Sequence, residues 1–360
     1  MKYQSLQGAG IFMLVMAGLG SLSTSMAQGQ SATLPNPNGH MGITGADPSI
    51  IRTAEGFVSV ESVAGRTIYV RAAPSLAKLA DSRPTPIWRD SDGLGEVWAP
   101  EIVRRNGRFQ VYFAAGAGSA HRMYVIESDS STSGYGMAVE VVLPQDKWAI
   151  DGLPLTYEGR SYFVWSGWQG DTDLAQDIFI AAMDADGQVL PPRVIIASPE
   201  QNWENIGKES PAINEGPQPV VDPAGQLHVV YSANGSWGEN YCIADLRLKA
   251  GAEPLDAGAW LGSDGCLFGA NAATLATGGT MVTKAKGVGH PSFVRGHEDP
   301  LLPGAAEGSS PFVYHGVPAK EQPRNFWAAR KWFIGAFQWV PDVTYGGNNP
   351  DLGWGLALSE

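Results

Sequence analysis

Carboxylates and one histidine recur where similar apolar stretches begin. The motifs are "ADPSIIR" around Asp47, "WAPEIV" with Glu101, "IDGLPL" around Asp151, "NEGPQ" around Glu215 and "GHPSFV" around His290. Carboxylates gathered in a partly desolvated place repel one another, which separates their pKa values and leaves one protonated while another is ionised. Cleavage of a glycosidic bond uses such a pair, because one acid protonates the leaving oxygen and a second carboxylate activates water or attacks directly.

The residues beside Glu215 suit a carboxylate that must point in one fixed direction. Gly216 permits close approach of neighbouring groups, and Pro217 fixes the backbone where the apolar stretch begins. The alternative is that carboxylates at such places only form turns, since Asp before Pro is a common turn element. Their recurrence at equivalent points of a repeat favours the catalytic interpretation.

Five units of similar design follow one another along the chain, headed by Pro48, Pro100, Pro154, Pro217 and Pro291. In each unit a turn with Gly leads to a second apolar strand, and a third strand follows. The second strands are "FVSV", "FQVYFA", "SYFVWSG", "LHVVYSA" and "PFVYHG". The third strands are "TIYV", "HRMYVIES", "DIFIAAM", "NYCIADL" and "FWAAR". These runs predict sheets that are buried on both faces.

Repeated four-stranded sheets around a channel form a β-propeller, and units of this size and number predict a five-bladed one. A pair of β-sandwiches is the alternative, but it does not require five units that begin alike. We expect an all-β protein with one propeller domain over residues 28–360, in which 28–49 lead in and "NNPDLGWGLALSE" is a closing strand or tail. The first strands line the channel in such a fold, so the residues at their starts converge at one end.

The composition agrees with this fold class and limits the partners. The 360 residues are 44% hydrophobic and 17% charged, enough for a large core. The 45 Gly and 25 Pro favour turns and short strands, and 12 Trp supply rings that stack on flat ligands. The formal charge is -12 and no basic run could follow a phosphate backbone, so nucleic acid is excluded as a partner.

The N-terminus predicts export. Lys2 precedes the apolar run "IFMLVMAGLG", and Ser25 and Ala27 are small residues three and one positions before a predicted cleavage site. Residues 1–27 are therefore interpreted as a signal peptide. A membrane anchor is the alternative, but its span needs about 20 apolar residues. We expect a periplasmic or secreted protein that leaves the membrane after processing. Cys242 and Cys266 either form a disulfide there or stay as buried free thiols.

The five motifs in this order, over about residues 45–340, resemble those of glycoside hydrolase family 43. The resemblance implies a five-bladed propeller that acts on arabinose- and xylose-containing polysaccharides with inversion at the anomeric carbon. It implies that Asp47 is the general base, that Glu215 is the general acid, and that Asp151 orients Glu215 and raises its pKa. We therefore expect the carboxyl groups of Asp47 and Glu215 to lie roughly 6.5–9.5 Å apart, with room for the attacking water.

The resemblance also implies ligand contacts. His290 matches a family histidine that binds calcium or another ion through water, although hard cations prefer oxygen ligands, so water alone is the alternative. Trp98 is the candidate floor for a furanose ring. The further candidates for substrate binding are Trp165, Ser166, Trp237 and Arg330. Trp237 is equally suited to packing at a blade edge.

The sequence narrows the class of substrate that we expect. No β-sandwich is expected after the propeller, which points away from two-domain β-xylosidases and toward enzymes that cleave α-L-arabinofuranosyl linkages in arabinan or arabinoxylan. Exo and endo action stay open, as does a β-xylosidase or another pentose-directed hydrolase. The alternatives of other classes are a retaining transferase, disfavoured because "NDPNG" and "RDP" motifs are missing, and a non-catalytic sugar-binding propeller. The expected partner is a plant cell-wall polysaccharide or oligosaccharide, and the expected state is a monomer.

Overall fold

The computed structural model describes residues 39–276, 278–294, 309–346 and 351–360. The predicted signal peptide, residues 1–27, lies outside the described residues. None of the helices in the described ranges is both long and apolar enough to cross a membrane.

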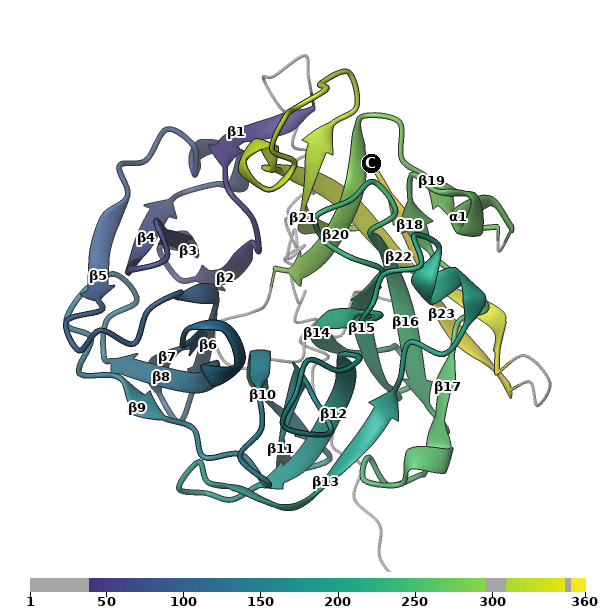
Figure 1. The fold of residues 1–360 in the computed structure, drawn as a ribbon, viewed down its shortest axis with the longest axis horizontal. Coiled ribbons are helices and arrows are strands. Elements are labelled where there is room, and N and C mark those ends of the chain that lie inside the picture. The colour runs from purple at the N-terminus through teal and green to yellow at the C-terminus, as the bar shows by residue number, and fades with distance from the viewer. Residues whose placement is uncertain (1–38, 277, 295–308, 347–350) are drawn as a thin grey trace, which may run out of the picture. The chain divides into compact units, whose positions relative to one another are not determined.

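Five sheets form a ring around a centre (Figure 1), and their strands are antiparallel except for one short pair in the fourth sheet. The first blade holds β2 (Ser49–Thr53), β3 (Gly56–Val63), β4 (Thr67–Ala73) and β5 (Thr85–Arg89). The second holds β6 (Trp98–Arg105), β7 (Arg108–Ala115), β8 (Arg122–Ser128) and β9 (Val139–Glu140). The third holds β10 (Ala149–Tyr157), β11 (Arg160–Gly167), β12 (Asp177–Met183) and β13 (Val189–Ala197). The predicted all-β, five-bladed propeller is confirmed.

The fourth blade is the most elaborate of the five. It holds β14 (Asn214–Val221), β15 (Leu227–Ala233), β16 (Cys242–Leu248), β17 (Trp260–Gly262), β18 (Phe268–Gly269) and β19 (Thr280–Met281). The five-residue helix α1 (Ala272–Ala276) lies between β18 and β19. The fifth blade holds β20 (Ala285–Phe293), β21 (Ser310–Pro318), β22 (Lys331–Tyr345), β1 (His40–Thr44) and β23 (Asp351–Ser359).

Apolar cores fill the spaces between neighbouring blades. All residues of β15 and of β20 are buried, because both faces of each strand pack against another blade. One core joins the third and fourth blades, with Leu153 and Val229 among its residues, and another joins the fourth and fifth, with Phe268 and Phe312. This packing explains the near-continuous apolar runs of the sequence.

The fifth blade joins both ends of the described chain. Its strand β22 pairs with β1 along its first half, where Thr44 lies opposite Lys331, and with β23 along its second half, where Tyr345 lies opposite Asp351. The segment that the sequence analysis treated as a lead-in thus contains the strand that closes the ring. The C-terminal segment forms the strand β23, which pairs with the second half of β22 and takes no part in closing the ring.

The predicted third strand of the fifth unit, "FWAAR", is wrong. Trp327–Ala329 form a turn of 3-10 helix, and the strand begins only afterwards, at Lys331. The Arg330 side chain turns back onto this helix, where its Nε donates to the carbonyl oxygen of Trp327 at 3.2 Å. Aromatic and apolar residues of this segment are therefore presented by a turn rather than paired in a sheet.

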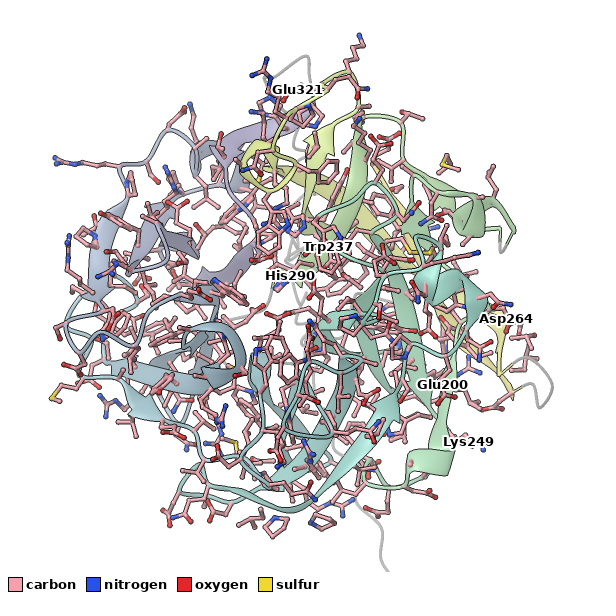
Figure 2. All side chains as sticks on the ribbon, in the orientation of Figure 1. Glu200, Trp237, Lys249, Asp264, His290 and Glu321 are labelled. Atoms are coloured by element: carbon pink, nitrogen blue, oxygen red, sulfur yellow. A yellow bond between two sulfur atoms is a disulfide. The ribbon has the colours of Figure 1, made fainter. Side chains whose placement is uncertain are left out.

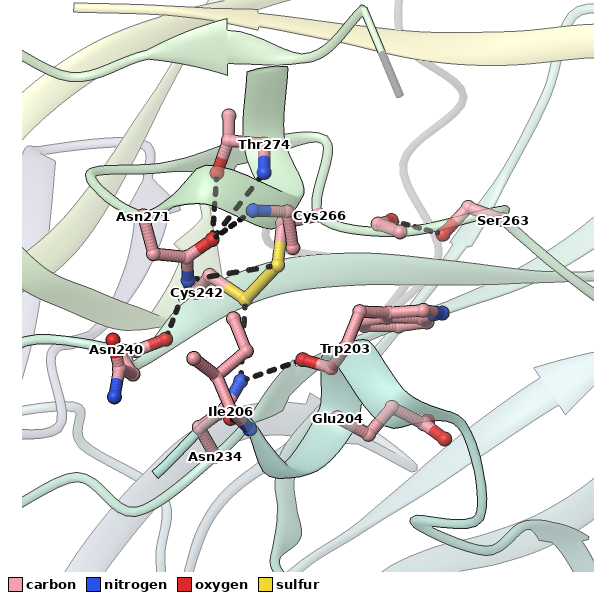
Figure 3. Close-up of a disulfide and its surroundings, with 12 residues drawn as sticks. Trp203, Glu204, Ile206, Asn234, Asn240, Cys242, Ser263, Cys266, Asn271 and Thr274 are labelled. Carbon is pink, nitrogen blue, oxygen red and sulfur yellow. Dashed lines mark hydrogen bonds between the residues drawn. A yellow bond between two sulfur atoms is a disulfide. The ribbon is translucent and has the colours of Figure 1, made fainter. Parts of the chain in front are cut away.

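Cys242 and Cys266 form a disulfide that ties β16 to the segment before β18 (Figure 3). Both cysteines are fully buried. Beside them, the Asn234 side chain accepts from the N–H of Ile206 at 2.8 Å and donates to the carbonyl of Trp203 at 3.1 Å. The disulfide and Asn234 together stabilise the outer part of the fourth blade, and of the two alternatives for the cysteines the structure contains the disulfide.

Replacing both cysteines by alanine is expected to lower the free energy of unfolding by about 3–4 kcal/mol, from the chain entropy of a closed loop of this length. The two cysteines are 24 residues apart in sequence. Denaturant unfolding of the double variant and of the wild type, each with and without reductant, measures this. Reductant should destabilise the wild type to the level of the variant and leave the variant unchanged; equal stability of all four samples would contradict the prediction.

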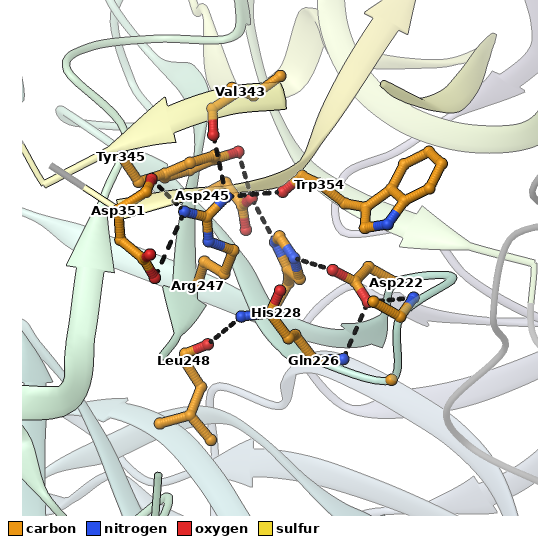
Figure 4. A network of polar contacts seen from close by, with 12 residues as sticks. Asp222, Gln226, His228, Asp245, Arg247, Leu248, Val343, Tyr345, Asp351 and Trp354 are labelled. Carbon is orange, nitrogen blue, oxygen red and sulfur yellow. Dashed lines mark hydrogen bonds and ion pairs between the residues drawn. The ribbon is translucent and has the colours of Figure 1, made fainter. Parts of the chain in front are cut away.

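A buried polar network fastens the end of β22 to the fourth blade (Figure 4). His228 Nδ1 lies 2.7 Å from Asp245 Oδ2, which also accepts from the Tyr345 hydroxyl at 2.8 Å. The buried Arg247 donates to the carbonyl of Val343 at 3.2 Å, and its guanidinium lies 4.5 Å from the centre of the Tyr345 ring. Buried charges persist only when they are paired and hydrogen-bonded. The C-terminal hairpin is therefore docked specifically against the fourth blade.

Candidate active site

Each blade begins, at the channel, with a residue in the left-handed backbone region. The φ angles are 49° at Asp47, 41° at Ala99, 55° at Asp151, 61° at Gly216 and 49° at His290. In four of the blades the pairing register shifts at this point, as it does at a β-bulge. A bulge bends the strand and redirects its side chains. This shared irregularity brings residues far apart in sequence to one end of the channel.

His290 lies at the centre of the cluster and is labelled near the middle of the ring in Figure 2. Its Nδ1 is 3.3 Å from Asp47 Oδ1 and 3.9 Å from Asp151 Oδ2. On the opposite side of the imidazole ring, its Nε2 is 3.2 Å from Glu101 Oε1. Only Asp47 among these keeps substantial exposure, with 27% of its side chain accessible. The histidine thus joins three carboxylates.

Gly216 has a steric reason to be glycine. A Cβ atom at this position would stand 3.1 Å from His290 Nδ1, closer than most side-chain contacts, and the φ of +61° disfavours other residues. The Gly216 N–H donates to Asp151 Oδ2 at 2.9 Å. Asp151 is therefore tied to the peptide that follows Glu215.

The start of β14 is held by buried side chains outside the channel. Glu204 Oε1 accepts from Asn214 Nδ2 and from the Tyr231 hydroxyl, both at 2.9 Å. The Ser166 hydroxyl donates to the carbonyl of Asn214 at 2.8 Å. Ser166 is fully buried, so its position suits support of the Glu215 backbone rather than the substrate contact that was predicted.

Asp47 is held in the ionised form. Burial alone would raise its pKa, but the charges of His290 and Arg330 keep the pKa well below its usual range. The N–H of Asp47 donates to His315 Nδ1 at 3.0 Å, so that imidazole nitrogen is unprotonated. Burial and the charge of Arg330 lower the pKa of His315 to about 4, which agrees with a neutral ring.

The pKa values of Asp151 and Glu215 are raised, in contrast to that of Asp47. Burial is the main cause that raises the pKa of Glu215, and the negative charge of Asp47 raises it further. The pKa of Asp151 is also raised, chiefly by burial, with His290 opposing the shift. Burial would lower the pKa of His290, but Asp47, Asp151 and Glu101 raise it to about 10. The site therefore combines a carboxyl group whose pKa is lowered, Asp47, with an imidazole and two carboxyl groups whose pKa values are raised.

Two further candidates, Trp98 and Arg330, lie in contacts compatible with substrate binding. Trp98 is half-buried, and its ring centre lies 3.9 Å from that of the fully buried His121, which supports one face of the indole. The Arg330 guanidinium lies 4.5 Å from the centre of the Trp327 ring and contributes its charge at Asp47. Arg330 can therefore border a ligand that reaches Asp47.

The remaining two candidates differ from each other. Trp237 is 44% exposed and is labelled near the centre of Figure 2. Trp165 is only 1% exposed, and its ring stacks on Phe179 with centres 5.4 Å apart. Its indole packs inside the third blade because successive residues of β11 face opposite sides. Trp165 does not fit the predicted substrate role.

Comparison with known proteins agrees with this geometry. The sequence model of the family described as "Glycosyl hydrolases family 43" matches residues 41–345. The chain belongs to this family. The resemblance predicted from the motifs is thereby confirmed.

Relatives of this family 43 chain include two proteins named extracellular exo-α-(1→5)-L-arabinofuranosidase. That of Streptomyces avermitilis is 30% identical over 255 residues, 68% of this chain and 51% of the relative. That of Streptomyces chartreusis is 27% identical over 259 residues, 69% of this chain and 75% of the relative. The chain spans about half the length of the first two curated relatives, 51% and 49%. The solved α-L-arabinofuranosidase of Lactobacillus brevis is 27% identical with a TM-score of 0.68, covering 86% and 95% of the two chains.

Two polar residues at the ends of second strands, Ser232 and His315, were missed as parts of this family 43 site. Like the predicted Ser166, which donates to the carbonyl of Asn214, each reaches the start of the next blade: Ser232 Oγ accepts from the N–H of His290 at 2.8 Å, and His315 Nδ1 accepts from the N–H of Asp47 at 3.0 Å. A signal was present, since "VWSG", "VYSA" and "VYHG" end alike in the repeat. Trp327 was also missed, because its segment was interpreted as a strand.

The rate of hydrolysis by this family 43 chain is expected to have an unusually acidic lower limit. Asp47, as the predicted base, acts in its ionised form, and its lowered pKa keeps it ionised below its ordinary value of 3.8. Glu215, as the predicted acid, acts in its protonated form, and its raised pKa is expected to extend activity to pH values above 4.5, the ordinary pKa of a Glu side chain, after which activity falls as pH rises. Measuring kcat/KM against pH, with stability checked by preincubation, tests both limits. An acid limit above 3.8 would contradict the assignment of Asp47.

Proposed function

We propose that this chain is a secreted, inverting glycoside hydrolase that removes α-L-arabinofuranosyl units from arabinan or arabinoxylan. The observation that carries the proposal is the cluster in which Asp47 and Asp151 meet His290, with Asp151 bound to the peptide after Glu215, and in which the pKa is lowered at Asp47 and raised at Glu215. An ionised base and a protonated acid are what a single displacement at an anomeric carbon requires.

The proposed reaction assigns one proton transfer to each of these carboxyls. Asp47 takes a proton from a water molecule while the water oxygen bonds to the anomeric carbon. The bond from that carbon to the leaving oxygen breaks, and Glu215 gives its proton to that oxygen. Asp151 holds the peptide after Glu215 through the Gly216 N–H. Because water attacks from the face opposite the leaving group, the product is inverted, which needs about 6.5–9.5 Å between the carboxyls of Asp47 and Glu215.

The substrate class and the location rest on different support. Two relatives are named extracellular exo-α-(1→5)-L-arabinofuranosidases, which supports an arabinofuranosyl substrate and an exported protein. The disulfide fits an oxidising compartment. Trp98, Trp237 and Arg330 are proposed to bind the sugar. The protein is proposed to act as a monomer on plant cell-wall polysaccharide.

The test is a product analysis with purified protein. Linear arabino-oligosaccharides, branched arabinan, arabinoxylan and an aryl xyloside are incubated separately, and products are followed over time, with the anomer assigned by NMR. Arabinose released alone, first as the β-anomer, supports an inverting exo-arabinofuranosidase. Mixed oligosaccharides would indicate endo action, and release of xylose alone would indicate a β-xylosidase. No product from any substrate would favour a sugar-binding propeller.

A further inference from the structure

Glu101 has no part in the proposed reaction, yet it is one of the most buried charged residues of the channel. It lies in β6 and is 1% exposed. Its Oε1 accepts from Gln218 Nε2 at 2.8 Å and lies 3.2 Å from His290 Nε2. Burying a carboxylate is costly unless it is paired and hydrogen-bonded. The contacts of Glu101 therefore point to a role for this charge behind the histidine.

The contacts of His290 fix its ring from several sides. Nε2 faces Glu101, Nδ1 faces Asp47, and the backbone N–H donates to Ser232 Oγ at 2.8 Å. The Gly216 backbone borders the ring so closely that a Cβ there would lie 3.1 Å from Nδ1. The imidazole cannot turn without losing one of its carboxylate partners. Its position at Asp47 thus depends on Glu101.

A calcium ion bound through His290 fits these residues poorly. Calcium takes about six to eight oxygen ligands at about 2.3–2.6 Å. Both ring nitrogens of His290 instead face carboxylates, Nε2 at 3.2 Å from Glu101 Oε1 and Nδ1 at 3.3 Å from Asp47 Oδ1, which leaves no space for an ion or a water molecule between them. Among the residues that the structure describes, no group of three or more His, Cys, Asp or Glu side chains could hold a metal.

We infer that Glu101 is a positioning residue which, with Gln218, clamps the His290 ring in one orientation, and that its carboxylate stands where an ion bound to His290 would stand. The clamp sets where the His290 ring meets Asp47, and so where the base stands relative to water. This inference rests on the proposed function for its kinetic part. Its structural part, a side chain in the place of a metal, does not.

The kinetic test is Glu101→Gln, which keeps the shape of the side chain and removes its charge. We expect kcat to fall about 10–100-fold, the range for partners that orient a functional group. KM should stay within about twofold, because Glu101 does not reach the sugar. The matched control is Glu127→Gln, since Glu127 also accepts from a glutamine, Gln110, but lies 37% exposed away from His290. It should match the wild type.

Two kinetic outcomes would overturn the inference: an unchanged kcat in Glu101→Gln, or an equal loss in the control. Thermal unfolding of both variants separates loss of the clamp from loss of the fold.

A second measurement uses the unmodified protein and needs no variant. Metal content is determined after purification, and the thermal midpoint and kcat are compared after dialysis against chelator and after addition of calcium chloride. The inference expects calcium well below one per chain and no change in either quantity. Stoichiometric calcium whose removal lowers the midpoint would overturn it. If the wild type hydrolysed no substrate, the proposed function would fail. The metal content and the thermal midpoint would still decide whether the Glu101 carboxylate stands where an ion would bind.

Discussion

Glu215→Gln is expected to lower kcat on arabino-oligosaccharides by at least about 10²–10⁴-fold, the usual contribution of general acid catalysis. The amide keeps the size of the side chain but cannot give a proton to the leaving oxygen. Glu215 is 8% exposed, so water replaces its proton poorly. The measurement is the initial rate of arabinose release, together with the unfolding midpoint to show that the fold is intact.

The leaving group provides the control for Glu215. An aryl α-L-arabinofuranoside with a strongly acidic phenol leaves without a proton, so Glu215→Gln should lose much less activity on it than on an oligosaccharide. Glu253→Gln changes an exposed carboxylate that pairs with Arg160, and it should have no effect on either substrate. Equal losses on both substrates would mean that Glu215 does not act as the acid, and unchanged hydrolysis would remove it from the mechanism.

Asp47→Asn is expected to lower kcat by about 10²–10⁴-fold on every substrate, whatever its leaving group, because the attacking water loses its base. Asparagine tolerates the left-handed conformation of this position, where φ is 49°, so the backbone should be retained. The substitution would also remove the ion pair with His290, which is 3.3 Å long in the wild type. The measurement is kcat on the oligosaccharide and the aryl substrate side by side.

Azide distinguishes loss of the base from loss of the site in Asp47→Asn. It is a nucleophile that needs no deprotonation, so it should restore the rate on the activated aryl substrate and form the arabinosyl azide of inverted configuration. Asp129→Asn is the control, because that side chain is 92% exposed. An azide product of retained configuration would indicate two displacements and would contradict an inverting mechanism.

Much of the fold could be predicted because each blade repeats the same local pattern. The first strands after Pro48 and Pro291, like the three between them, are buried on both faces, and their apolar runs identify them directly. The closing pair could not be predicted in this way. Its partners, β1 and β22, lie near opposite ends of the described chain, and nothing in the sequence of His40–Thr44 distinguishes a closing strand from a linker.

The candidate site could also be predicted only in part. Asp47, Asp151 and His290 meet as expected, because the propeller brings equivalent positions of its blades together. Trp165 could not be excluded from the sequence, since its direction depends on which face of β11 turns inward. The pairing of Glu101 with His290 depends on bulges that shift the register of β6 and β20, and side-chain types alone do not reveal them.

The pairing of β1 with β22 affects how the protein is made. Synthesis proceeds from the N-terminus, so β1 is made before the five blades are complete, and its partner Lys331–Tyr345 is made after the first four of them. Until then the nascent chain carries unpaired strand edges, which other chains can join. Closure of the ring must therefore wait until β22 has been made, and this step joins distant parts of the chain, which is slow compared with local pairing. Chaperones that delay premature association during this interval should raise the yield of active protein more than any factor that speeds formation of a single blade.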